Sequence, residues 1–151
     1  MRSLELLGQR SSKVTSSEIQ ARSFIATDPE SLTVYVAFED EQAHIRVAAT
    51  NLAPGDPNAF VELGRCPASA IVNFTFLADL QVVCLCTYNG DIMLFSKERF
   101  ENGDEAMEIM GSVDSGIHAM CWSPDQDLVV LVTGKIMQHV KLVSQVKYML
   151  K

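Results

Sequence analysis

The chain has 151 residues, of which 48% are hydrophobic and 21% are charged. This balance is typical of a folded globular domain and excludes a chain that is disordered throughout. No stretch approaches the roughly 20 apolar residues that a membrane-spanning helix needs, and residues 1–12 lack the apolar run of a secretory signal. The sequence therefore predicts an intracellular protein with no membrane association.

Charge is distributed unevenly along the chain. Residues 1–134 contain all 19 acidic residues but only 8 of the 12 basic ones, which gives this part a net charge of −11. The last 17 residues carry four lysines and no acidic residue, a net charge of +4. Because an acidic surface repels phosphate backbones, we expect no direct nucleic-acid binding by residues 1–134.

The first part of the chain contains strand signals separated by turns. Residues 32–38 alternate as a strand does, and residues 45–49 resume the pattern after an acidic interruption. Residues 28–31 predict a turn, and the proline-containing residues 51–58 predict a loop between repeat units. Residues 18–27 fit either a helical turn or a strand.

An internal repeat is the strongest structural signal. Residues 71–87 align without a gap on residues 117–133 at a constant offset of 46. The two-strand pattern occurs a third time, more weakly, at an offset of about 49, where Val34 falls on Val83. A period in the forties is close to the roughly 40–45 residues of a four-stranded propeller blade. Helical repeats of similar length would show a 3.6-residue periodicity, which is absent from these segments.

The residues that follow the repeat segment 71–87 predict the remaining strands of the same blade. Residues 88–91 (YNGD) predict a type I′ hairpin turn, because this turn needs positive φ at both central positions and Asn-Gly supplies it. Residues 92–95 are predicted to form the return strand, residues 97–106 a charged loop, and residues 107–113 an outer or linking strand.

The last unit, residues 114–134, predicts a hairpin around a Ser-Pro-Asp turn. Pro124 presets φ for a type I turn, and the polar side chains beside it favour local hydrogen bonds. Residues 128–132 are an unbroken apolar run, typical of a strand buried on both faces. Because Trp122 aligns with Phe76, we expect it to occupy a repeated core position.

These units together predict an all-β fold, a partial WD40-like β-propeller of about three blade units over residues 1–134. The pattern fails after Gly134, so residues 135–151 are assigned to a divergent basic segment. Its apolar positions fit one face of a short C-terminal helix, and a final strand over residues 136–142 fits almost as well. Binding of this segment to a membrane or a calmodulin-like protein is a weaker alternative.

No local motif indicates a catalytic, cofactor-binding or metal-binding residue. The chain has no phosphate-binding glycine motif, and its three histidines and four cysteines lack zinc-ligand spacing. Cys84 and Cys86 lie two apart in a predicted strand, and we expect them to be a buried pair of small hydrophobic residues. Trp122 is the only tryptophan. Four aspartates are expected to be hydrogen-bonding turn residues: Asp79, Asp91, Asp114 and Asp125.

Five short segments carry a family resemblance through their order and their distance from the amino terminus. They are residues 1–6 (MRSLEL), 90–92 (GDI), 111–117 (GSVDSGI), 121–128 (CWSPDQDL) and 131–134 (LVTG). Together they resemble the first-propeller region of the largest, scaffolding subunit of the Elongator complex. The resemblance covers most of residues 1–134 and is strongest from about residue 80.

This resemblance implies a non-catalytic scaffold subunit with two WD40-type propellers, a helical repeat region and a dimerising basic C-terminal part. It implies a role in tRNA wobble-uridine (U34) modification through contacts with other Elongator subunits, including the catalytic radical-SAM subunit. The implied location is the cytoplasm, with the nucleus as an additional site. A generic WD40 protein-interaction module unrelated to tRNA is the alternative.

Two features of the chain depart from this family pattern. Three blade units are too few to close a propeller, which takes at least four, and the family protein is many times longer. We therefore expect the chain to be a truncated product, an alternative gene model or one fragment of a split chain.

Overall fold

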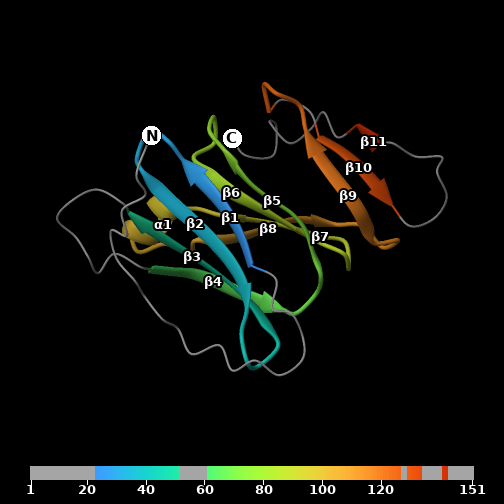
Figure 1. Cartoon of the computed structure of the whole chain (residues 1–151), viewed down its shortest axis with the longest axis horizontal. Coiled ribbons are helices and arrows are strands. Elements are labelled where there is room, and N and C mark those ends of the chain that lie inside the picture. The colour runs from blue at the N-terminus through green and yellow to red at the C-terminus, as the bar shows by residue number, and fades with distance from the viewer. Residues whose placement is uncertain (1–22, 52–60, 127–128, 134–140, 143–151) are drawn as a thin grey trace, which may run out of the picture.

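The computed structural model describes residues 23–51, 61–126, 129–133 and 141–142 (Figure 1). The strands are β1 (Ser23–Asp28), β2 (Thr33–Glu39), β3 (His44–Asn51), β4 (Val61–Pro67), β5 (Ile71–Leu77), β6 (Val82–Thr87), β7 (Asp91–Phe95), β8 (Met107–Ser112), β9 (Ile117–Trp122), β10 (Val129–Thr133) and β11 (Lys141–Leu142). The one helix in these residues is α1 (Lys97–Glu101), and no described helix is long and apolar enough to cross a membrane. The predicted all-β class is confirmed.

The described strands form three antiparallel sheets, which we call blades 1, 2 and 3. Blade 1 has the order β1-β2-β3-β4, blade 2 the order β5-β6-β7-β8, and blade 3 the order β9-β10-β11. The first strand of blade 2, β5, lies against the first strands of both other blades. Figure 1 shows blade 2 between the other two. This is the arrangement of successive propeller blades.

The three blades begin with the same hairpin, which explains the internal repeat. In blade 2 the paired residues run from Ile71 with Thr87 to Leu77 with Val82, and blade 3 repeats this register 46 residues later. One extra residue bulges after the first pair in both blades, Val72 in blade 2 and His118 in blade 3. Blade 1 shows the same geometry at an offset of 49, because Leu32 and Gln81 both close their turns with positive φ, 55° and 54°.

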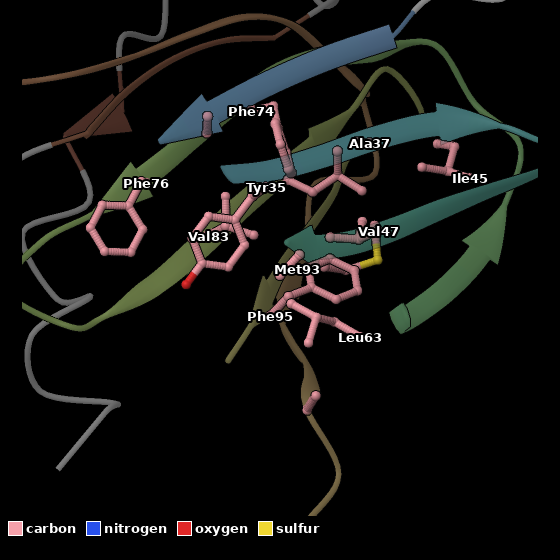
Figure 2. Packing of buried hydrophobic residues seen from close by; sticks show 14 of the residues in the cluster. Tyr35, Ala37, Ile45, Val47, Leu63, Phe74, Phe76, Val83, Met93 and Phe95 are labelled. Carbon is pink, nitrogen blue, oxygen red and sulfur yellow. The ribbon is translucent and has the colours of Figure 1, made fainter. Parts of the chain in front are cut away.

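Blades 1 and 2 pack face to face through a hydrophobic core, the first interblade core. Figure 2 shows side chains from β2, β3 and β4 meeting side chains from β5, β6 and β7 in this core. The Tyr35 ring stacks on Phe76 at a centroid distance of 5.5 Å, and Phe95 is fully buried. Loss of water contact by these apolar surfaces is the main stabilising contribution to the blade pair.

A second interblade core joins blades 2 and 3. It contains Cys84 and Cys86 of β6 together with Met120 of β9 and Leu131 of β10. Strand β6 therefore serves both cores, with alternate residues facing blade 1 and blade 3, and every residue from Val83 to Thr87 is buried. Period-two alternation in a strand buried on both faces produces this division.

The structure corrects three local predictions. Residues 128–132 were expected to be buried on both faces, but within the described β10 Val129 and Leu131 are buried whereas Val132 is 45% exposed. The predicted charged loop at residues 97–106 contains α1, whose N-cap Ser96 accepts a hydrogen bond from the Arg99 backbone N–H at 3.2 Å. Serine is a favourable N-cap because its oxygen satisfies a free N–H of the first turn.

The Asn89-Gly90 turn also differs from the type I′ prediction. Gly90 has φ of +107°, whereas Asn89 is not among the described residues with positive φ. The Thr87 carbonyl accepts a hydrogen bond from the Gly90 N–H at 3.0 Å, so the turn spans Thr87 to Gly90 and ends on the glycine. A type I′ turn needs two positive φ angles in succession, and this hairpin uses one.

Several predictions fall at the edges of the described chain. The undecided residues 18–27 include part of β1, which is a strand, and β4 was not predicted at all. Residues 141–142 form β11 and pair with β10, in agreement with the strand alternative for that segment. The helix alternative for residues 135–151 otherwise falls outside the described residues, as do residues 1–22 and the predicted loop after Asn51.

Candidate functional site

Cys84 and Cys86 are a buried pair in β6, as predicted. Both are fully buried in the second interblade core. Burial raises the pKa of Cys84 well above its usual range, and burial followed by the nearby Asp91 charge raises the pKa of Cys86 to about 12. Because the thiolate is the nucleophile and the metal ligand, thiols held protonated in this way are structural.

The described residues contain no group of three or more His, Cys, Asp or Glu side chains that could hold a metal ion. Of the two described histidines, His44 lies beside Asp40 with 3.8 Å between its Nδ1 and a carboxylate oxygen. His118 lies at the bulge of β9 and is exposed. These imidazoles belong to different blades. The His44 Nδ1 is buried without a hydrogen-bond partner, and the His118 ring meets the Tyr88 ring.

The four aspartates named from the sequence lie in separate turns or strand starts. Asp79 is in the β5–β6 turn, Asp91 begins β7, and Asp114 is in the β8–β9 turn. Asp125 is in the β9–β10 turn, where its carboxylate accepts a hydrogen bond from the Ser123 hydroxyl. Their positions agree with a role in turns.

Two further aspartates accept hydrogen bonds within turns. The turn at residues 28–31 was predicted, but the roles of Asp28 and Asp40 in their turns were not. The buried Asp28 accepts hydrogen bonds from the Ser31 hydroxyl and from the Glu30 N–H at 3.0 Å, and the Ser31 bond is the main reason that its pKa is lowered. Asp40 accepts from the backbone N–H groups of His44 (3.0 Å) and Gln42 (2.9 Å), which lower its pKa. The signal available in the sequence was an aspartate at the start of a short turn.

Polar side chains join blade 3 to blade 2 in addition to the core. The Gln126 side chain accepts a hydrogen bond from the Ala78 N–H at 2.8 Å and donates one to the Phe76 carbonyl at 3.0 Å. Asn73 donates to the Met120 carbonyl at 3.3 Å. These bonds fix the relative position of two blades, and none of them could be read from sequence spacing.

An exposed aromatic pair lies at the junction of blades 2 and 3. Tyr88 is 48% exposed, and its ring meets His118 edge to face, with 4.9 Å between ring centroids. The Tyr88 backbone bridges the blades, because its N–H donates to Ala70 (2.7 Å) and its carbonyl accepts from Ile117 (3.1 Å). An exposed aromatic side chain therefore lies on a backbone segment that is hydrogen-bonded to both blades.

A hollow of about 260 Å³ lies beside α1 at the edge of blade 2. Its apolar lining comes from Leu80, Val82 and Leu94, and its rim carries Arg99 and Glu108, which form an ion pair of 3.0 Å. The Ser96 side chain also lines the hollow, and its hydroxyl caps the amino-terminal end of α1.

The described residues form successive antiparallel blades that are joined by interblade cores and by polar contacts. This is the architecture of part of a β-propeller. The described residues show no assembled reactive centre among the groups considered above. The family model described as ELP1 first N-terminal beta-propeller matches residues 1–148, nearly the whole chain, and the chain belongs to this family.

Curated relatives agree with this assignment. The chain is 41% identical over 68 residues to Elongator complex protein 1 of Oryctolagus cuniculus and 37% identical over 68 residues to that of Mus musculus. It is 35% identical over 65 residues to Elongator complex protein 1 of Schizosaccharomyces pombe. These alignments cover 42–45% of this chain and 5% of each relative, so the matched part is a small piece of the relatives' length.

Proposed function

We propose that the chain contributes propeller blades to the scaffold subunit of an Elongator complex and acts through contacts with other subunits. The observation that carries this proposal is the family match over residues 1–148. The blade order supports it, because a stack of sheets offers loops and edges to partners while its interblade cores keep those surfaces in place. The relatives are themselves named as an Elongator protein.

The proposed role is non-catalytic support of tRNA wobble-uridine modification, with the chemistry in the radical-SAM subunit. Thiols made unreactive by burial and aspartates placed in turns favour a structural role for the polar groups. The net charge of −11 over residues 1–134 favours protein partners over direct tRNA contact. The proposed location of the protein is the cytoplasm, where it meets these partners, and also the nucleus.

The test is affinity purification of the tagged chain from its own cells, followed by mass spectrometry. We expect Elongator subunits, including the radical-SAM subunit, to be enriched over a tag-only sample. If the purification yields other proteins but no Elongator subunit, the generic WD40 interaction module is the better description. A chain that recovers no partner above background contradicts both.

A pair of surface variants shows which contact is used. Tyr88→Ser removes an exposed ring at the junction of blades 2 and 3 while its backbone bonds remain, and Ile109→Ser removes an exposed side chain from the outer strand β8. We expect the first variant to lower the recovery of Elongator subunits several-fold and the second to leave it unchanged. Equal recovery by both excludes the Tyr88 surface as the contact.

A further inference from the structure

The face of blade 2 that packs on blade 3 extends beyond the second interblade core. Its outer part is formed by β7 and β8, where Ile92 lies opposite Gly111. On the same face Leu94 lies opposite Glu108, and both of these residues line the hollow beside α1. Leu94 belongs to the second interblade core, and Leu80, which also lines the hollow, packs against that core. The hollow therefore continues an interface that already joins two blades.

The interface between blades 1 and 2 shows how this outer part is covered elsewhere in the repeat. Gly64 of β4 and Gly111 of β8 have the same place in their blades, because each pairs with the third strand immediately before a bulge. A Cβ at Gly64 would lie 3.1 Å from the Phe95 ring and 3.3 Å from Met107. A Cβ at Gly111 would meet nothing within 4 Å. Blade 2 thus covers the outer strand of blade 1, whereas the described part of blade 3 leaves the outer strand of blade 2 open.

The register of β11 shows which part of the chain leads to the open place. Strands β6 and β10 are related by the offset of 46, and in this relation Leu142 of β11 has the pairing position of Leu94 of β7. Val143 then has the position of Phe95, the residue that covers Gly64. The residues that follow β11 are therefore the counterpart of those that cover blade 1.

The rim of the hollow has an excess of negative charge. The segment from α1 through Glu108 contains five acidic and two basic residues, a net charge of −3. The two basic residues, Lys97 and Arg99, pair with Glu101 at 3.2 Å and with Glu108 at 3.0 Å. Among the described residues this leaves Glu98, which lines the hollow, without an ion pair. A cationic side chain is favoured beside it.

The segment that follows β11 has the complementary composition. Residues 143–151 contain two lysines and no acidic residue, a net charge of +2. They also contain Val143, Val146 and Leu150, whose spacing fits one apolar face. An apolar and basic segment thus begins next to a hollow with an apolar lining and an acidic rim.

We propose that residues 143–151 occupy the hollow beside α1, with their apolar residues against its lining and a lysine at Glu98. This contact extends the second interblade core over the outer strands of blade 2, as β7 and β8 extend the first core over β4. It holds blade 3 to blade 2 at the outer edge, whereas Asn73 and Gln126 hold the two blades through β5 and the turn after it. The contact lies within one chain and does not depend on the proposed role in Elongator.

Carbodiimide cross-linking tests the contact in the full chain, because this reagent joins a lysine directly to a neighbouring carboxylate. The two carboxylates that line the hollow belong to Glu98 and Glu108. After digestion and mass spectrometry, we expect peptides in which Lys147 or Lys151 is joined to one of them. Glu98→Gln should lower the yield of these peptides several-fold.

The positive control and the other possible occupants are read from the same digest. The Lys97–Glu101 ion pair should give its own cross-link in every sample, and recovery of this link alone overturns the proposal. Links from Lys13 to the lining carboxylates would assign the hollow to the amino-terminal segment. In a mixture of nitrogen-15-labelled and unlabelled chains, links between the two kinds would assign it to a second copy. Either result overturns the proposal.

Thiol labelling tests the apolar part of the contact. In a Cys121→Ser background, which removes the exposed native thiol, Leu80→Cys places a thiol in the lining of the hollow. We expect a maleimide to modify this thiol several-fold faster when Val146→Asp is added, but not when Ser144→Asp adds the same charge outside the apolar positions. The three buried native cysteines should stay unmodified in each folded variant. Equal rates in the two variants overturn the proposed docking.

Discussion

Phe76 and Trp122 occupy the same place in two repeat units but are not equally buried. Phe76 is 8% exposed and its ring stacks on Tyr35, whereas Trp122 is partly buried at the edge of the second interblade core. Sequence alignment predicted a core position for both. The offset of 49 explains the difference, because the residue equivalent to Tyr35 in blade 2 is Cys84, whose small side chain covers less of an aromatic ring.

Truncation of these two residues should therefore have unequal effects. We expect Phe76→Ala to lower the free energy of unfolding by about 3–5 kcal/mol, as for a buried aromatic residue, and Trp122→Ala to lower it by about 1–3 kcal/mol. Urea denaturation at one fixed protein concentration gives both values. A loss at Trp122 as large as that at Phe76 would show that the indole is a full core residue.

Single strands and turns could be predicted where the local hydrophobic alternation matches the burial of the side chains. The hairpins of blades 2 and 3 were predicted because their alternation repeats at one offset. Strand β4 (VELGRCP) was missed because Gly64 and Pro67 disfavour strands. It forms nevertheless, since Gly64 allows close approach: a Cβ there would lie 3.1 Å from Phe95. Such tertiary contacts are not visible in local sequence.

The same limit applies to the candidate contact surfaces. The Tyr88–His118 pair joins residues of two blades, and the hollow beside α1 combines β6, β7, β8 and the helix. The residues that form them are far apart in the chain and share no motif. Cys84 and Cys86, by contrast, were predicted correctly, because residues two apart in a strand share a face and free cysteine packs well in cores.

The turn between β6 and β7 provides a prediction about a whole element. Gly90 has φ of +107°, and a Cβ added there would lie 2.1 Å from the Val113 carbonyl oxygen. Gly90→Ala must therefore displace the start of the β8–β9 connection, and we expect a loss of more than about 1 kcal/mol in the free energy of unfolding.

Gly111 is the matched control, because it lies opposite Ile92 in the neighbouring strand and a Cβ there would meet nothing within 4 Å. We expect Gly111→Ala to change the free energy of unfolding by less than about 0.5 kcal/mol. Thermal unfolding of the two variants in parallel makes the comparison. Similar stability of both would mean that the turn adapts without cost.

In the molecule as a whole, stability is expected to vary from blade to blade because each blade contacts only its neighbours. Blade 2 takes part in both interblade cores, whereas each terminal blade takes part in one. In repeat architectures the units with one neighbour open first. The polar links of Gln126 and Asn73 hold blade 3 to blade 2, but they replace hydrogen bonds to water and add little net stability.

Hydrogen exchange followed by mass spectrometry measures this order directly. We expect amides of β6, whose residues from Val83 to Thr87 are all buried, to exchange slowest, and amides of β9 and β10 to exchange faster by an order of magnitude or more. Uniform protection of all three blades would show instead that they open as one cooperative unit, in which case the two interblade cores cannot be treated as separate contributions.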